Sequence, residues 1–442
     1  MSDWQEEYKN KFVSVKEAAG MVKSGDRVFI SPVNDPPALS AALAARKNEL
    51  KNVEITLSGV PASDAGWYDP SLEDVFPLTV FFAGSLARRR LDVRAADFTP
   101  FIFSLYSKPW EDKRETAGQW DWFFQVVSPP DKYGYCSYGN MIWHKKSMRV
   151  GGSYKKTIAE VDANQIRTFG DNSIHVSEID YFVENTKPRP APVFTLEITD
   201  LSRTIAGYVS SLVRDGDTIQ LGTGTVTDAL AVVGAFDDKH DLGIHTEMTS
   251  HGMVDLVKRG VVTGKHKTIH PGKVVASCFW PEPGALDYVD MNPVFELYDV
   301  DYVNDVRTIS SHDNMVAINT AIGIDFTGQI AVESIGPRLW SAPGGQMEFA
   351  LGALYSKGGR YIVCLASTAT VKGKTVSRIM PQLEAGTMLT IPRSLTDYVV
   401  TEYGIARLLG KSQRQRANEL ISIAHPDFRA DLKKAAQKLF YQ

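Results

Sequence analysis

Short apolar runs rich in β-branched and aromatic residues alternate with helix-length segments along the whole chain. The first series consists of a strand-like run at 27–31, a helical pattern at 37–48 and a second strand-like run at 53–58. Strands that alternate with helices in this way are typical of α/β proteins with parallel sheets. We therefore predict an α/β fold with largely parallel sheets.

The same series recurs in the second half of the chain. A Gly-Asp pair at 25–26 precedes an apolar strand, a loop and the helix-like ALSAALAAR. A Gly-Asp pair at 216–217 precedes TIQLG, the loop GTGT and DALAVVGAF, where we also predict a helix. A second strand follows in each half, at 53–58 and at 242–248. The repeat is too long and too degenerate for a solenoid, so it predicts two related α/β domains with the active site in the cleft at their interface.

The clearest linker is the proline-rich segment ENTKPRPAPV at 184–193. Proline ends helices and favours extended chain. We therefore predict an N-terminal domain over 1–188 and a C-terminal domain over 189–442.

Composition and charge narrow the class of protein. Hydrophobic residues make up 43% of the 442 residues and charged residues 23%, as in ordinary folded proteins. A net charge of -4 gives no field for nucleic acid or an anionic membrane. No apolar run approaches the roughly 20 residues of a membrane helix, and the N-terminus lacks the pattern of a signal peptide. We predict a cytoplasmic protein without nucleic-acid or membrane partners. Cys136, Cys278 and Cys364 are too dispersed for a disulfide framework or a zinc site, so no metal is expected.

Glu247 is the candidate nucleophile. It lies directly after a β-like run, in IHTEM at 244–248, and before the helix-like 252–258. Ligands of doubly wound sheets bind at the carboxyl ends of strands, so a carboxylate there is placed for attack. A glutamate that only caps the next helix is the simpler alternative. The first half has Ser58 or a neighbour at the corresponding position, which marks the second half as the chemical one.

The segment LGTGTVTD at 221–228 lies between a strand and the predicted helix. Its small residues let backbone N–H groups and the helix N-terminus approach an anion. A tight turn explains the same residues without a ligand. A third interpretation is the dinucleotide fingerprint GxGxxG, followed about 20 positions later by an acidic residue. Thr227 stands where the third glycine is required, but Glu247 is suitably spaced to hold a ribose hydroxyl, as in an oxidoreductase.

Three further features bear on the chemistry. Gly344 and Gly345 in SAPGGQMEF either aim backbone donors at an oxyanion or form only a flexible turn. Lys372 lies in a loop-like stretch and is either solvated or a phosphate ligand. His245 and His251 flank Glu247 without the spacing of metal ligands. The sequence has no GxSxG nucleophile elbow, which disfavours an ordinary α/β-hydrolase thioesterase.

Taken together, seven segments in collinear order resemble the acetyl-CoA hydrolase/transferase family, especially its 4-hydroxybutyrate and butyryl-CoA:acetate CoA-transferases. They are VVSPPDKYGYCSYG (126–139), FGDNSIHVSEID (169–180), DGDTIQLGTGTVTDAL (215–230), LGIHTEM (242–248), VNDVRTISSHDNMVAINTAIGIDFTGQI (303–330), GGQMEF (344–349) and DYVVTEYGIARL (397–408). The similarity spans nearly the whole chain.

The resemblance implies roles for individual residues. The family's nucleophilic glutamate corresponds to Glu247, and coenzyme A enters as a substrate, with no tightly bound cofactor. The residues that the resemblance implies for CoA binding are Gly222, Thr223, Gly224, Thr225, Val226, Ile322, Gly345 and Lys372. Those it implies for the acyl or carboxylate substrate are Asn304, Gly344, Gln346 and Glu402.

The function that the resemblance implies is transfer of CoA from a short-chain acyl-CoA to a carboxylic acid, by ping-pong kinetics through a glutamyl-CoA thioester. Acetate, butyrate, 4-hydroxybutyrate and short dicarboxylates such as itaconate or succinate all remain open. This chain has GTGTVT where relatives commonly have GIGGIP, and GGQMEF where they have GGQVDF. Acyl-CoA hydrolysis by the same glutamate and non-covalent nucleotide binding are the alternatives. A homo-oligomer is expected.

Overall fold

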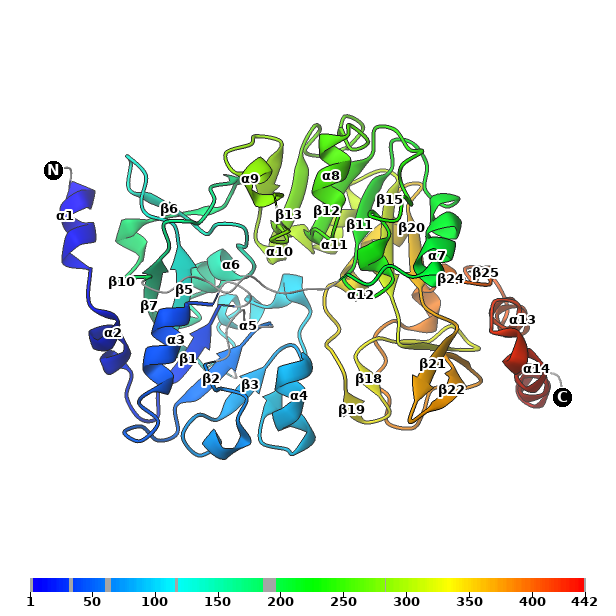
Figure 1. Ribbon diagram of the computed structural model, residues 1–442, viewed down its shortest axis with the longest axis horizontal. Coiled ribbons are helices and arrows are strands. Elements are labelled where there is room, and N and C mark those ends of the chain that lie inside the picture. The colour runs from blue at the N-terminus through cyan, green and yellow to red at the C-terminus, as the bar shows by residue number, and fades with distance from the viewer. Residues whose placement is uncertain are drawn as a thin grey trace. The chain divides into compact units, whose positions relative to one another are not determined.

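The computed structural model describes residues 3–31, 35–59, 65–115, 118–185, 196–282 and 284–440. Its chain forms two compact units, of which the first comprises 1–193 and 277–301 and the second 194–276 and 302–442 (Figure 1). The predicted boundary between residues 188 and 189 lies outside the described residues.

The segment 277–301 is hydrogen-bonded into the first unit. The Phe279 N–H donates to the Asn140 carbonyl at 2.8 Å. The Asp299 carboxylate accepts the backbone N–H groups of Lys146 and Ser147, each at 3.0 Å. The predicted limits place this segment in the C-terminal domain instead. They divide the sequence at a single point, and such a division cannot represent a segment that packs back onto an earlier unit.

A seven-stranded parallel sheet in the order β10-β7-β5-β1-β2-β3-β4 forms the first unit. Its strands are β1 (Arg27–Ile30), β2 (Glu54–Leu57), β3 (Leu78–Val80), β4 (Asp97–Phe98), β5 (Trp120–Val127), β7 (Tyr154–Val161) and β10 (Tyr181–Glu184). The α-helices are α1 (Asp3–Asn10), α2 (Val15–Met21), α3 (Pro37–Ala44), α4 (Ser85–Asp92), α5 (Lys108–Glu111), α6 (Lys145–Gly151) and α9 (Leu286–Val289). The shorter strands are β6 (Tyr135–Ser137), β8 (Phe169–Gly170), β9 (Ser173–His175) and β14 (Phe295–Leu297).

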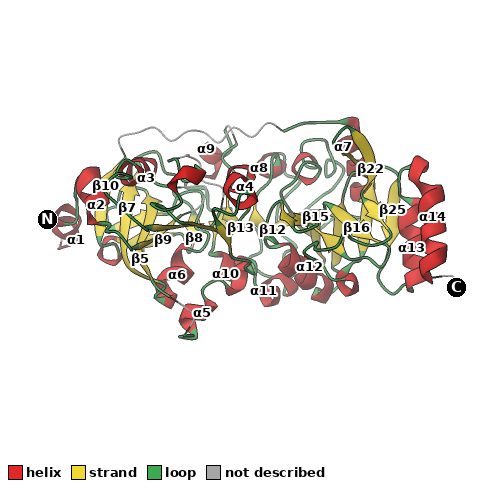
Figure 2. Ribbon diagram, turned by 90° about the horizontal axis from the view of Figure 1, so that it is seen from below, coloured by secondary structure: helices red, strands yellow, loops and turns green. Residues whose placement is uncertain are grey.

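Both faces of this sheet are buried. Val28 and Ile30 pack in one core with Leu39 of α3, whereas Phe29 lies in a separate aromatic cluster with Tyr106. Successive side chains of a strand point to opposite faces, so the two cores lie on the two sides of β1. Figure 2 shows helices on both sides of these strands. This burial explains the nearly continuous apolar runs of the sequence.

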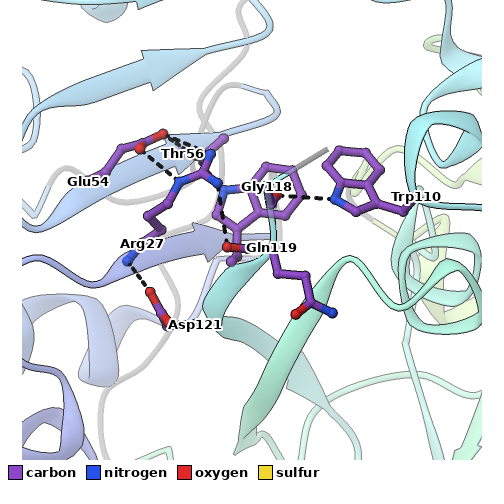
Figure 3. A network of polar contacts seen from close by, with 8 residues as sticks. Arg27, Glu54, Thr56, Trp110, Gly118, Gln119 and Asp121 are labelled. Atoms are coloured by element: carbon purple, nitrogen blue, oxygen red, sulfur yellow. Dashed lines mark hydrogen bonds and ion pairs between the residues drawn. The ribbon is translucent and has the colours of Figure 1, made fainter. Parts of the chain in front are cut away.

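A polar network joins the amino-terminal parts of three neighbouring strands (Figure 3). The Arg27 backbone N–H donates to Asp121 at 2.8 Å, and its Nε donates to Glu54 at 2.9 Å. These residues belong to β1, β5 and β2, so the network holds the register of adjacent strands.

In the second unit the strand order is β25-β24-β20-β15-β11-β12-β13. Its strands are β11 (Thr218–Leu221), β12 (Gly243–Met248), β13 (Val274–Cys278), β15 (Met315–Thr320), β20 (Arg360–Cys364), β24 (Tyr398–Thr401) and β25 (Gly404–Arg407). The pairs from β24 to β12 are parallel, and β25 is antiparallel to β24.

Helices and smaller strands surround this second sheet. The α-helices are α7 (Asp200–Ser210), α8 (Met253–Lys258), α10 (Val300–Val303), α11 (Val306–Ser310), α12 (Gln346–Tyr355), α13 (Gln413–Ser422) and α14 (Pro426–Phe440). The smaller strands are β16 (Gly323–Asp325), β17 (Ile330–Ala331), β18 (Ser334–Ile335), β19 (Arg338–Leu339), β21 (Thr368–Val371), β22 (Lys374–Ser377) and β23 (Ile379–Met380). Within the described ranges, no helix is both long and apolar enough to cross a membrane.

The two large sheets are built alike. The order β10-β7-β5-β1-β2-β3 corresponds strand for strand to β24-β20-β15-β11-β12-β13. The Gly-Asp turns before β1 and β11 also match: Asp26 accepts the Lys23 N–H at 2.8 Å, and Asp217 accepts the Arg214 N–H at 2.7 Å. The predicted α/β class, with two related and largely parallel domains, is confirmed.

The helix predicted over DALAVVGAF is wrong. Only a three-residue 3-10 helix, Thr227–Ala229, forms there, and turns follow it. Gly234 adopts a φ of +87°, a left-handed conformation that ends any regular helix. The glycine loop therefore lacks the helix N-terminus on which the predicted anion site depended.

Candidate active site

Glu247 lies near the end of β12, which is a central strand of the second sheet. The Asn304 side chain forms a hydrogen bond with the Glu247 carboxylate. The Asn304 side-chain amide donates to Glu247 Oε2 at 2.7 Å and to Glu348 Oε2 at 3.2 Å. An amide nitrogen carries two hydrogens, so one asparagine serves both carboxylates. This arrangement also determines which end of the amide faces Glu247, because only the nitrogen donates.

Gly345 completes this cluster through its backbone. A Cβ built on Gly345 would clash with Glu247 Oε2 and Asn304 Nδ2. The residue has an ordinary φ of -85°, so close approach, and not backbone conformation, requires glycine here. The Gly345 backbone forms a hydrogen bond with the Glu247 carboxylate. Glu247 thus receives one side-chain and one backbone hydrogen bond.

The environment changes the acidity of Glu247. Burial, and to a smaller extent the nearby Glu348 carboxylate, raise the pKa of its carboxyl group, and the hydrogen bonds from Asn304 and Gly345 lower it, so that the resulting pKa is about 8. The Glu247 side chain nevertheless stays partly exposed. A poorly solvated carboxylate that remains accessible is more basic than one in water, as a nucleophile requires.

His245 lies two residues before Glu247, on the same face of β12. Its Nε2 is 2.8 Å from the Val303 carbonyl oxygen, one residue before Asn304. Burial lowers the pKa of His245 to about 3, so its imidazole is neutral and donates through Nε2–H. The bonds from His245 to Val303 and from Asn304 to Glu247 therefore join one face of β12 to the segment that carries Asn304.

The glycine loop at 222–226 follows β11, which lies between β12 and β15. A Cβ on Gly222 would clash with Asn319, and one on Gly224 with Thr320, both in β15. The Gly224 N–H donates to the Asp228 carboxylate at 3.1 Å, so this donor is used inside the loop. Thr223 and Thr225 are exposed, whereas Val226 is buried.

Ile322 and Gln346 lie beside the carboxyl end of β15. The Ile322 N–H donates to the Ala331 carbonyl at 2.9 Å. The Gln346 side chain donates to the Thr320 carbonyl at 3.1 Å and to the Tyr361 hydroxyl at 2.7 Å. Gln346 is thereby occupied in holding the start of α12 against β15 and β20.

Glu402 follows β24, and Lys372 lies on the hairpin that follows β20. Glu402 accepts the Ser367 N–H at 2.9 Å and the Ser367 hydroxyl at 2.6 Å. Lys372 is exposed at the tip of the β21–β22 hairpin, where the sequence predicted a loop. Lys372 and Gly373 both have positive φ, +48° and +77°, as a type I′ hairpin turn requires.

Of the predicted site residues, Glu247, Asn304 and Gly345 are in direct contact. Gly344 has a φ of +57° and lies in the turn that directly precedes α12, together with Gly345. The glycine loop, Ile322, Gln346 and Glu402 follow or flank the carboxyl ends of neighbouring parallel strands.

Glu348 was not among the site residues predicted from the sequence, and it is buried with 3% of its surface exposed. A usable signal was present, since Glu348 is the only charged residue in the mostly apolar helix QMEFALGALY.

Comparisons with known proteins show which family the chain matches. The acetyl-CoA hydrolase/transferase N-terminal domain matches residues 1–193, and the C-terminal domain of the same name matches residues 284–436. The chain is similar to the 4-hydroxybutyrate coenzyme A transferase of Clostridium kluyveri, with 40% identity over 99% of this chain and 100% of the relative. It is 35% identical to the butyryl-CoA:acetate CoA-transferase of Anaerostipes caccae, over 98% of each chain. Among solved structures, RipA from Yersinia pestis has a TM-score of 0.89 and 31% identity, with 99% of each chain covered.

Proposed function

The chain belongs to the acetyl-CoA hydrolase/transferase family and is a CoA-transferase, and from this premise we propose that it transfers CoA through a covalent thioester on Glu247. The substrates are an acyl-CoA and a carboxylic acid. The observation that carries the proposal is the hydrogen-bonded cluster of Glu247, Asn304 and Gly345 at the carboxyl edge of the second sheet.

The reaction divides into two matched halves. A Glu247 carboxylate oxygen attacks the thioester carbonyl carbon, the C–S bond breaks, and an acyl-glutamyl anhydride and CoA thiolate form. The thiolate then attacks the glutamyl carbonyl carbon of the anhydride, the first acid leaves as a carboxylate, and Glu247 carries CoA as a thioester. A second carboxylate reverses both steps. Each step exchanges one anion for another, so no proton is consumed.

The surroundings of Glu247 suit both steps. Burial and the Glu348 carboxylate disfavour the negative charge of Glu247, and this penalty disappears when the carboxylate becomes an anhydride or a thioester. The Asn304 amide and the Gly345 backbone already bond to the carboxylate, so they are placed to stabilise an oxyanion there. A well-aimed donor of this kind contributes about 2.7–4 kcal/mol to the transition state.

The remaining predicted residues take their places around this centre in the proposal. The glycine loop at 222–226, Ile322, Gly345 and Lys372 bind CoA, with the Lys372 ammonium meeting a phosphate. Gly344, Gln346 and Glu402 lie on the side of the acid. The acid is a short carboxylate such as acetate, butyrate or 4-hydroxybutyrate, or a short dicarboxylate such as itaconate or succinate.

The covalent intermediate provides the test. The enzyme is incubated with an acyl-CoA and no acceptor acid, quenched with borohydride or hydroxylamine, and mapped by mass spectrometry. Borohydride converts a glutamyl thioester into an alcohol, and hydroxylamine converts it into a hydroxamate, so either mass change identifies the side chain. We expect the label on Glu247, its discharge by excess carboxylate, and its absence from Glu247→Gln.

Two outcomes would overturn the proposal. Labelling of another residue would move the active site, and turnover without labelling would require transfer or hydrolysis without a covalent enzyme. Release of free CoA in the absence of an acceptor measures hydrolysis by the same glutamate separately.

A further inference from the structure

We propose that Arg378 binds an anionic group of the CoA-ester substrate, which is either a phosphate of CoA or a second carboxylate on the acyl group. The inference rests on the proposed function, because it assumes an acyl-CoA bound to the second unit. Arg378 lies between β22 and β23, outside every motif used above.

The backbone of Arg378 is held on both sides. Its N–H donates to the Ser367 carbonyl at 2.9 Å, and its carbonyl accepts the Ile324 N–H at 2.9 Å. Ser367 follows β20, and Ile324 follows the end of β15. β15 and β20 are parallel neighbours, so these contacts place Arg378 at their carboxyl edge, the edge near which Glu247 lies in β12.

The Arg378 guanidinium has no hydrogen bond or ion pair with any residue that the structure describes. The side chain is half-buried, and burial lowers the pKa of Arg378, against the opposing effect of Glu402. Glu402 bonds instead to the backbone and hydroxyl of Ser367. A partly desolvated guanidinium with five donors and no acceptor lacks the partner that such groups normally have.

A second arginine of the same unit shows the contrast. Arg360 begins β20 and is buried, and its guanidinium forms an ion pair with Asp217 across the amino ends of β20 and β11. Its charge is satisfied within the fold, so it needs no ligand. Arg378 lies toward the other end of the same sheet and forms no ion pair with Glu402 or with any other carboxylate among the described residues.

The neighbours of Arg378 are proposed CoA contacts. The hairpin that ends at Ser377 carries Lys372 at its tip, and Ile322 lies two residues before Ile324, which bonds to Arg378. A planar guanidinium suits the paired oxygens of a phosphate or a carboxylate. Arg378 would therefore complete a site in which Lys372 supplies a flexible charge and Arg378 a fixed one.

The test compares Arg378→Ala and Arg378→Lys with the control Lys357→Ala. Lys357 carries a positive charge that is 88% exposed, just before β20 at the opposite edge of the sheet. KM and kcat are measured with acetyl-CoA, with acetyl-pantetheine, which lacks the nucleotide, and with succinyl-CoA. We expect Arg378→Ala to raise the affected KM about ten- to a hundredfold with little change in kcat. Arg378→Lys should recover part of the loss, and Lys357→Ala should behave as wild type.

The three substrates separate the two anions. A raised KM for acetyl-CoA with an unchanged KM for acetyl-pantetheine identifies a CoA phosphate, whereas an effect confined to succinyl-CoA identifies the acyl carboxylate. Unchanged KM values for all three substrates in both variants would overturn the inference, as would a loss confined to kcat. Trapping the Glu247 thioester distinguishes this inference from the proposed function. If Arg378→Lys is labelled at saturating acyl-CoA and has wild-type KM values, only the role of Arg378 is refuted. If the wild-type enzyme is not labelled, the proposed function is refuted.

Discussion

The two large sheets share a strand order but differ at matching positions near the carboxyl ends of their second strands. In the first sheet Glu54 pairs with Arg27, and Ser58 lies four residues further on. In the second sheet Gly243 pairs with Thr218, and Glu247 lies four residues further on. The register therefore makes Ser58 the counterpart of Glu247, as the sequence repeat predicted.

The surroundings of these two positions differ as much as the residues. Ser58 is buried, with 1% of its surface exposed, and its hydroxyl has no hydrogen-bond partner in the part of the chain that the structure describes. Glu247 is partly exposed and receives hydrogen bonds from Asn304 and Gly345. The first unit has a buried carboxylate of its own, Glu160, which accepts the N–H groups of Ala38 and Leu39 at the start of α3, each at 3.0 Å.

A carboxylate needs both bound donors and an accessible side in order to react. Glu160 bonds to the first turn of a helix and is fully buried, so it stabilises that helix end. Glu247 is held by two donors but keeps an open side. The same sheet architecture therefore holds a structural carboxylate in one unit and, in our proposal, a covalent nucleophile in the other.

The largest expected effect comes from making the second sheet resemble the first. Glu247→Ser removes the nucleophile, and we expect transfer to fall by about three orders of magnitude or more. CoA exchange between acetyl-CoA and labelled acetate measures it, with circular dichroism as the control for folding. Glu247→Asp should retain some transfer with proportionally more hydrolysis, because the shortened side chain spoils the geometry. Near wild-type transfer in Glu247→Ser would refute the role of this residue.

The reverse change places a carboxylate in the first sheet. Ser58→Glu buries a charge without the donors that surround Glu247, and we expect the free energy of unfolding to fall by about 3–5 kcal/mol. Urea denaturation measures the loss, and Ser58→Ala is the control, since it removes only an unpartnered hydroxyl. In the Glu247→Gln background, Ser58→Glu should restore no transfer. Restored transfer would show that the strand position alone carries the chemistry.

Asn304 is the donor that most distinguishes the second site from the first. Asn304→Ala should lower kcat by about a hundredfold, because it removes a hydrogen bond to the reacting carboxylate. It should also raise the apparent pKa of Glu247 above about 8, because this bond lowers it in the native protein. The pH profile of kcat/KM should therefore rise at higher pH in the variant. An unshifted profile would separate Asn304 from Glu247.

Lys372→Ala tests the proposed CoA contact at the tip of the β21–β22 hairpin in the second unit. Lys372→Ala should raise the KM for acyl-CoA severalfold with little change in kcat, because the exposed hairpin tip meets CoA and not the reacting carbonyl. An acyl-pantetheine should show no such change. A loss confined to kcat would place Lys372 in the chemical step.

The smallest expected effect concerns stability. The pKa of Glu247 is about 8 in the folded protein and near 4.5 when the chain is unfolded, so the folded state binds more protons between these values. Stability from this group is present below about pH 4.5 and is lost as the pH rises through about 8. We therefore expect Glu247→Gln to be more stable than wild type by about 1–2 kcal/mol at pH 9 and equally stable at pH 4.5. Thermal unfolding at both pH values measures the difference, and a constant difference would contradict this account.

The α/β class, the duplicated strand pattern and the position of Glu247 near the end of a strand could all be predicted from the sequence. These features are local, because an apolar run, a Gly-Asp turn and a strand followed by a polar residue can be read within a few residues. The resemblance to the family also rested on contiguous motifs, which include Asn304 and Gly345.

The contacts between those motifs could be seen only in the tertiary structure. The helix predicted after the glycine loop failed because Gly234 adopts a left-handed conformation and turns replace the helix. Glu348 became part of the site because the Asn304 amide, 44 residues away in sequence, bonds to it. The Arg378 guanidinium forms no ion pair with Glu402, because the Glu402 carboxylate accepts hydrogen bonds from Ser367 instead. The first result depends on a backbone conformation that the apolar pattern does not reveal. The other two depend on contacts between distant segments, and packing decides such contacts after the local pattern has determined the strands and helices.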